Sequence, residues 1–172
     1  MTRPILNLDE VDLKPMPPEY AATGPAAERY APLVGQLGTR VGAQKLGYNV
    51  TALPPGKRAY PRHNHWINEE MFLVLAGQGE VCIGEATYPL RPGDVIACPP
   101  GGPETAHQIR NTGTEELRYL AISTRMLPEV VEYPDSGKFG VKALLGPDAE
   151  GKPQSFQALG RDRDAVHYWD GE

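Results

Sequence analysis

Seven short runs of strand-forming residues recur along the middle of this chain, and their rhythm limits the fold more than any other feature. The runs are residues 48–53, 71–76, 80–83, 87–90, 95–98, 107–111 and 117–123. Most of them end in a turn signal rich in Gly and Pro, such as residues 54–56, 91–94 and 99–102. Short strands closed by tight turns about every ten residues indicate an all-β sandwich or barrel. The intervals leave no room for crossover helices, so a parallel α/β sheet is not expected.

The segments on either side of these runs are less regular. Residues 1–45 contain several prolines, and we interpret them as an N-terminal arm in which residues 26–36 could form a short helix. Residues 46–127 form the predicted barrel core, and residues 128–172 form a C-terminal extension. Within the extension, residues 133–138 and 146–153 have the composition of loops. We expect the tail to pack back on the barrel through Tyr168 and Trp169.

Composition narrows the classes of partner and compartment. The net charge is −5 and the chain has no run of basic residues, which disfavours nucleic acid as a partner. The sequence has no long apolar run and does not begin like a secretory signal, so neither a membrane nor secretion is expected and the cytoplasm is the default. Cys82 and Cys98 form no CxxC pair, and we interpret them as small apolar side chains. A disulfide between them would require adjacent strands, which the sequence does not establish.

Three of the four histidines fall where they could share one metal ion. His63 and His65 stand two residues apart, and alternate residues of a strand face the same side. Glu70 opens the apolar run 71–76, and His107 opens a later strand. Three nitrogens and one carboxylate oxygen suit a single divalent ion of Mn, Fe, Co, Ni, Cu or Zn. A lone HxH is a weak signal, so the order of the surrounding turns matters.

That order resembles the cupin superfamily, a group of double-stranded β-helix or jelly-roll barrels. The first cupin motif is matched by Gly56, His63, His65, Glu70 and Gly77, and the second by Gly93, Pro99, Gly101, His107 and Asn111. The turn before His107 is longer than in the family pattern. The resemblance covers roughly residues 45–125 and is closest to small single-domain, type-2 cupins. It implies an all-β jelly roll with His63, His65, Glu70 and His107 as metal ligands.

Strand alternation extends the prediction to the walls of the site. Phe72 and Val74 are expected to face inward with Glu70, Ile109 and Asn111 with His107, and Val95 with Ala97. The same alternation points Glu69 outward, and it places Arg58, Tyr60, Arg62, Gln108 and Arg110 on the surface. If a bulge turned Tyr60 or Arg62 inward, that residue would anchor the substrate.

Glu104, in the lengthened turn, is the candidate catalytic acid or base, although a loop carboxylate is usually solvated. His167 is expected on the surface of the tail.

The fold alone does not select the chemistry. The leading hypothesis is a metal-dependent enzyme acting on a small oxygenated substrate, because similar small cupins carry provisional labels as sugar or sugar-phosphate isomerases. An iron-dependent dioxygenase and a ligand-binding cupin without catalysis are the alternatives, so whether the chain is an enzyme stays open. A homodimer is expected by the same resemblance, with the arm and the tail covering sheet edges.

Overall fold

The computed structural model describes residues 3–172 and confirms the all-β prediction. Short 3-10 helices are the helical elements of this range, and they are Leu8–Glu10 (η1), Gly24–Ala26 (η2), Gly38–Val41 (η3), Pro103–Thr105 (η4) and Asp162–Asp164 (η5). The strands are Lys14–Pro15 (β1), Leu33–Gln36 (β2), Leu46–Leu53 (β3), Asn64–His65 (β4), Glu70–Ala76 (β5), Gly79–Ile83 (β6), Ala86–Leu90 (β7), Val95–Cys98 (β8), His107–Arg110 (β9), Leu117–Thr124 (β10), Glu129–Tyr133 (β11), Lys138–Leu145 (β12) and Gln154–Arg161 (β13).

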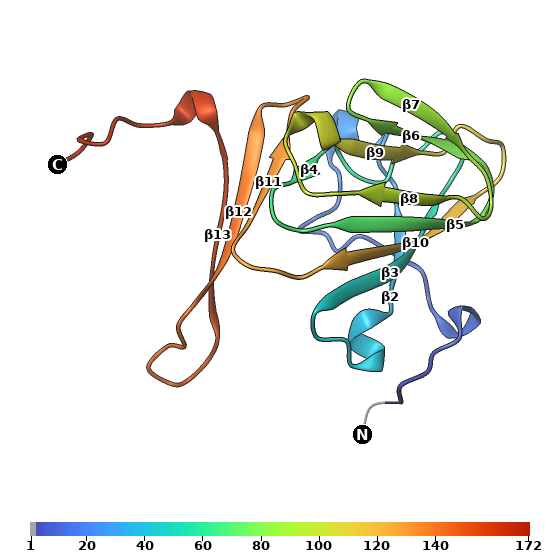
Figure 1. Ribbon diagram of the computed structural model, residues 1–172, viewed down its shortest axis with the longest axis horizontal. Coiled ribbons are helices and arrows are strands. Elements are labelled where there is room, and N and C mark those ends of the chain that lie inside the picture. Colours follow the sequence, from blue (N-terminus) through green and yellow to red (C-terminus); the bar gives the residue numbers. More distant parts are fainter. Residues whose placement is uncertain (1–2) are drawn as a thin grey trace.

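The strands form a barrel with two walls (Figure 1). One wall is a sheet in the order β1-β2-β3-β10-β5-β8. The other consists of a β7-β6-β9 sheet and a β13-β12-β11-β4 sheet. Residues 58–63 join these two sheets, because Arg58 bridges Arg110 of β9 and His63 bridges His107 of β9. All the strand pairs are antiparallel, as expected for strands connected by tight turns.

The hydrophobic core lies between the two walls. Phe72 and Val74 of β5 and Tyr119 of β10 extend from the first wall, and Val81 of β6 and Ile109 of β9 extend from the second. All five are at most 7% exposed. Burying a large apolar side chain contributes roughly 1.5–3 kcal/mol, so these contacts hold the walls together. Phe72, Val74 and Ile109 therefore face inward, as the alternation predicts.

Turn chemistry sets the register between the strands. In the β7–β8 turn, Asp94 accepts the backbone N–H of Arg91 at 2.8 Å, and Gly93 takes the left-handed backbone conformation with φ of +94°. Asn111 is buried after β9, where its amide donates to the carbonyls of Leu53 and Glu115 at 2.7 and 2.8 Å. The prediction that Asn111 faces inward is thus confirmed, and its side chain serves to fix the turn between β9 and β10.

The two ends of the chain differ from their predicted structure. Residues 33–36 of the segment expected to contain a helix form β2, which pairs with β3. The C-terminal extension is a meander in which β11, β12 and β13 pair in succession. At one end of the molecule, β12 and β13 extend away from the barrel (Figure 1). Tyr168 and Trp169 are 83% and 68% exposed, so the expected packing of these rings on the barrel does not form. The extension contacts the barrel through β11 instead, which pairs with β4. The apolar character of the two rings did not predict this pairing.

Two smaller predictions concern the cysteines and the membrane. Both thiols are free, and they lie in different sheets, Cys82 in β6 and Cys98 in β8. Burial, helped by the charge of Glu70, raises the pKa of Cys98 to about 12, which keeps this thiol protonated and unreactive.

Within residues 3–172, no helix has the length and apolar character needed to cross a membrane.

We predict that Gly77→Ala destabilises the barrel far more than Gly93→Ala. Both glycines have positive φ, and a side chain there costs roughly 1–2 kcal/mol. A Cβ at Gly77 would also lie 2.2 Å from the carbonyl oxygen of Glu116, whereas a Cβ at Gly93 would meet no heavy atom of the described chain within 4 Å. Urea denaturation should show a loss of about 3 kcal/mol or more for Gly77→Ala and about 1 kcal/mol for Gly93→Ala. Equal losses would show that the β5–β6 turn is not tightly packed.

Candidate metal centre

Backbone pairing between two chain segments places the histidines on one side of the barrel interior. The backbone N–H of His63 donates to the carbonyl of His107 at 3.2 Å, and that of His107 donates to His63 at 2.8 Å. Directly opposite residues of an antiparallel pair project their side chains to the same face. His65 follows two residues later in β4, and Gly101 of the long turn donates its N–H to the His65 carbonyl at 2.8 Å. Glu70 begins β5 in the opposite wall.

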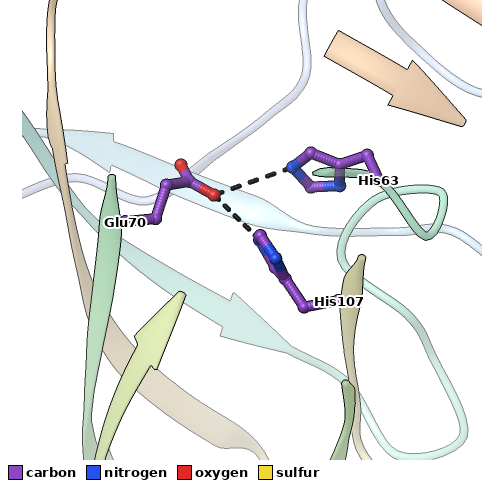
Figure 2. A group of neighbouring side chains, drawn as sticks. All are labelled: His63, Glu70 and His107. Atoms are coloured by element: carbon purple, nitrogen blue, oxygen red, sulfur yellow. Dashed lines mark hydrogen bonds and ion pairs between the residues drawn. The ribbon is translucent and has the colours of Figure 1, made fainter. Parts of the chain in front are cut away.

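The three imidazole rings converge on one carboxylate oxygen of Glu70. Oε2 of Glu70 lies 3.0 Å from Nε2 of His107, 3.5 Å from Nε2 of His65 and 3.7 Å from Nε2 of His63. Figure 2 shows His63 and His107 pointing toward this carboxylate. The ligand atoms of His63, Glu70 and His107 all lie within 4.8 Å of one another, and His65 borders this group.

The outer nitrogen of each ring faces an acceptor. Nδ1 of His63 lies 2.8 Å from the carbonyl of Pro61, and Nδ1 of His107 lies 3.2 Å from that of Thr105. Nδ1 of His65 lies 3.6 Å from a carboxylate oxygen of Glu129. A carbonyl at Nδ1 favours the tautomer with the proton on that nitrogen, which leaves the Nε2 lone pair free. The rings are therefore oriented to present Nε2 to a shared point.

These donors fit a divalent ion. Lone pairs of neutral Nε2 atoms and an ionised carboxylate repel each other unless positive charge lies between them. Both nitrogens of His65 are buried without a hydrogen-bond partner among the described residues, which is costly for polar atoms. Two ligands bonded to one ion at about 2.1 Å lie roughly 3.0–4.2 Å apart, and the three carboxylate–imidazole separations fall in that range.

The electrostatics of the group also favour positive charge. Burial by itself would raise the pKa of Glu70, but His107, His63 and His65 outweigh it and hold this pKa well below its usual range. Burial would lower the pKa of His65, but the carboxylates of Glu70 and Glu129 outweigh it and raise this pKa. Glu70 is therefore ionised at neutral pH and attracts a cation.

Comparison with known proteins agrees with this arrangement. Residues 49–123 match the family model described as a cupin domain. The barrel has the cupin fold. An uncharacterized protein from Methanocaldococcus jannaschii is 33% identical over 61 residues, which are 36% of this chain and 46% of that protein. The chain spans about half the length of the curated relatives it matches.

Solved structures extend the similarity to nearly the whole chain. A protein of Acidithiobacillus ferrooxidans, provisionally named a sugar phosphate isomerase, is 25% identical with a TM-score of 0.75, and the match covers 96% of both chains. A cupin from Silicibacter pomeroyi, named a sugar phosphate isomerase, is 24% identical with a TM-score of 0.73. That match covers 97% of this chain and 98% of the other, and it shows the same fold. The arm and the C-terminal meander therefore belong to an architecture found in other cupins.

The cupin site opens into a cavity of about 280 Å³ with mostly apolar walls. Phe72, Ile109 and Val131 line it, and none of its lining residues is Lys or Arg. The prediction that Val95 and Ala97 face inward was wrong, because both are exposed and their neighbours Ile96 and Cys98 are buried. The β-sheet register explains this, since Cys98 pairs with Glu70 and Ile96 with Phe72, and paired residues share a face.

Five residues near the ligands were predicted on the surface, and two of them contribute to the cavity. Tyr60 lines it, and so does Gln108, which is 7% exposed and donates to the Tyr60 carbonyl at 2.6 Å. Residues 58–63 form only isolated β-bridges with β9, so simple strand alternation fails there. Arg58 and Arg110 are half-buried and do not line the cavity. Arg62 instead forms an ion pair with Asp135 at 2.9 Å and donates to the Gly84 carbonyl at 2.8 Å.

Glu104 does not lie with the ligands. Its side chain is exposed, does not line the cavity, and accepts the backbone N–H of Gly102 at 3.0 Å. The carboxylate thus stabilises its own turn, and we withdraw its candidate catalytic role. His167 lies exposed in the tail, and Glu69 is exposed beside Glu70, as expected.

Sequence reasoning missed Glu129, a buried carboxylate behind His65. Glu129 is 6% exposed, and its carboxylate accepts the backbone N–H groups of Ile67 and Asn68 at 3.3 and 3.0 Å. The side-chain amide of Asn68 also donates to it. Glu129 lies in β11, beyond the cupin motifs, so only its place beside the apolar Val130 and Val131 hinted at burial.

We predict that Glu129→Gln weakens binding of divalent metal by about 10–100-fold, because the carboxylate orients His65 and increases its basicity. Calorimetric titration of apo-protein with Mn²⁺ or Zn²⁺ would measure the change. Glu69→Gln is the matched control, since it removes an exposed carboxylate next to Glu70 and should leave metal affinity unchanged. Equal affinity in Glu129→Gln and the unmodified protein would contradict the assigned role.

Proposed function

We propose that this cupin is a metal-dependent enzyme acting on a small oxygenated molecule, by reactions of the sugar- or sugar-phosphate-isomerase kind. The observation that supports it is the convergence of three imidazole nitrogens and the Glu70 carboxylate beside a cavity of about 280 Å³. Cupin domains often bind a metal, and the Acidithiobacillus protein with the same architecture carries a provisional isomerase name.

His63, His65, Glu70 and His107 would hold one divalent transition metal. When bound, such an ion acts as a Lewis acid toward a carbonyl or hydroxyl oxygen of the substrate. One carboxylate and three neutral imidazoles leave a net positive charge on the centre, which favours substrates that carry oxygen donors. The barrel walls exclude water on the remaining sides and strengthen every electrostatic contact inside.

Two phenols in the cavity are suited to hydrogen bonding with the substrate. Burial and the charge of Glu70 raise the pKa of Tyr60, and burial raises the pKa of Tyr133. Both hydroxyls therefore keep their protons at neutral pH. The Tyr133 hydroxyl would donate to substrate oxygens, and the Tyr60 hydroxyl, which contacts the sulfur of Met16 at 3.9 Å, would do so on turning from this contact. Among the residues that line the cavity, Glu70 is the one carboxylate, and the absence of Lys and Arg there favours unphosphorylated substrates over phosphorylated ones.

We predict the metal content and the folding of the double variant His63→Ala/His65→Ala from the proposed ligand set. It should lose stoichiometric metal while keeping a cooperative thermal unfolding transition, because the two rings lie outside the main hydrophobic cluster. Elemental analysis of protein purified without metal-affinity resin would measure the metal content. His167→Ala removes the one histidine outside the proposed ligand set, which is exposed, and this variant should retain the metal. Full metal in the double variant would refute the ligand assignment.

The catalytic part of the proposal requires its own assay. Metal-reconstituted protein should interconvert an aldose and a ketose in a panel of free sugars and sugar phosphates, and the double histidine variant should not. Absence of isomerisation with every metal would contradict this part while leaving the metal centre intact. Oxygen consumption by iron-loaded protein would identify a dioxygenase instead.

We also propose that the protein forms a homodimer through β13. This strand is at the edge of its sheet, and Phe156 and Leu159 on it are 49% and 66% exposed. An exposed edge strand of eight residues leaves a row of backbone groups unpaired, which favours pairing with a second copy of the strand. Sedimentation velocity should show a dimer that Leu159→Lys converts to a monomer, while Ala149→Lys, an equal charge change in the exposed β12–β13 loop, should not. A monomer at all concentrations would exclude this interface.

A further inference from the structure

A second cavity lies beneath the N-terminal arm, next to the metal cavity. Its volume is about 440 Å³, and its lining includes Met16, Tyr20, Tyr30, Pro32, Ala59 and Tyr60. No charged side chain belongs to its lining, and most of the surface is carbon from Ala, Pro, Leu, Met and Tyr. Cavities that bind organic ligands have volumes of roughly 300–1,000 Å³, so this one, which we call the arm cavity, is large enough for a ring-sized group.

The arm is fastened to the barrel wall at the floor of this cavity. The backbone N–H of Arg58 donates to the carbonyl of Arg29 at 2.8 Å, and Tyr30 forms a β-bridge with Arg58. The Lys57 ammonium donates to the Glu28 carbonyl at 2.6 Å. Farther along the arm, β2 pairs with β3 through four residue pairs. These main-chain contacts keep the cavity open before any ligand arrives, which reduces the ordering cost of binding.

Tyr60 is the residue at which the two cavities meet. Ala59 and Tyr60 line both the arm cavity and the metal cavity. The Tyr60 hydroxyl lies 3.9 Å from the sulfur of Met16 in the arm, and its backbone carbonyl accepts from Gln108 in the barrel. A third cavity shares Asn49 and Tyr60 with the metal cavity and Met16 and Tyr20 with the arm cavity. The metal cavity and the arm cavity therefore adjoin at Tyr60, and the third cavity, which Lys14 and Arg40 also line, borders both.

We propose that the arm cavity binds an apolar, ring-sized group of the substrate whose oxygen atoms bind at the metal centre. This inference rests on the metal centre of the proposed function and not on its sugar substrates. It assigns as substrate class an amphipathic oxyacid or hydroxycarbonyl compound. The metal cavity, at about 280 Å³, contains the ligand atoms and would receive the oxygenated head. The carbon-rich lining of the arm cavity stabilises an apolar group and has no cation for a phosphate.

A pair of 2-hydroxy acids tests the proposal directly. Lactate and 3-phenyllactate present the same carboxylate and hydroxyl to the metal and differ by a phenyl ring. Calorimetric titration of Mn²⁺-loaded protein should show phenyllactate binding at least tenfold more tightly than lactate, because only its ring reaches the arm cavity. Equal affinities, or tighter binding of a sugar phosphate than of phenyllactate, would overturn the proposal.

A matched pair of variants locates the ring. Ala26 lines the arm cavity but not the metal cavity, whereas its neighbour Ala27 is exposed and lines neither. Ala26→Leu should reduce phenyllactate affinity to that of lactate and leave Mn²⁺ and lactate affinities unchanged, and Ala27→Leu should change none of them. Ala22→Leu fills the same cavity from another position, and it replaces Ala26→Leu if that variant does not fold. Undiminished phenyllactate binding in the folded filling variant would place the ring elsewhere.

Failure of the metal centre can be distinguished from failure of the arm cavity. NMR titration of metal-free protein with benzyl alcohol measures ring binding without any chelating head. Chemical-shift changes at residues 20–33 that the filling variant abolishes would support the arm cavity even if the protein bound no metal. Metal binding with no response to benzyl alcohol and no preference for phenyllactate would overturn the arm cavity and leave the metal centre standing.

Discussion

The packing of the two barrel walls on each other is the interaction on which the rest of this structure depends, because it brings three imidazole nitrogens onto the Glu70 carboxylate. This convergence requires β5 of one wall to approach residues 63–65 and His107 of the other closely, with Oε2 of Glu70 and Nε2 of His107 3.0 Å apart. The hydrophobic cluster between the walls supplies the free energy for that approach, because Phe72 and Ile109 are buried beside the ligands. The same walls shield the charges from water, so electrostatic contacts with a bound ion and its ligand are stronger than on a surface.

Buried charge at the centre has to be compensated by the surrounding structure. Glu129 is almost fully buried and accepts hydrogen bonds from the backbone N–H groups of Ile67, Asn68 and Val130 and from the side-chain amide of Asn68, which offset its lost hydration. Its carboxylate in turn faces the outer nitrogen of His65. The C-terminal meander therefore takes part in the metal centre, since β11 supplies this carboxylate and also Tyr133 at the cavity wall.

The segments outside the conserved barrel give this cupin its individual features. Residues 49–123 match the general family model, and they include all four proposed ligands. Glu129 and Tyr133 follow that segment, and most of the arm-cavity lining precedes it. The barrel with the cupin fold thus carries the proposed ligands, whereas the arm and the meander shape the space around them. This division fits the general rule that one fold serves many functions through the elements added to it.

The sequence by itself determined the barrel strands and predicted the four side chains that converge, because local signals specify both. Alternating strand formers and Gly- or Pro-rich turns marked β3 and β5 through β10, and the HxH, Glu70 and His107 order marked the site. Only the tertiary structure decided that Ile96 and Cys98 face inward rather than Val95 and Ala97, since the β5–β8 register sets that face. It also decided the inward position of Tyr60 and the burial of Glu129 behind His65. These depend on pairings between distant segments, and no local pattern of residues encodes which distant segment will be the neighbour.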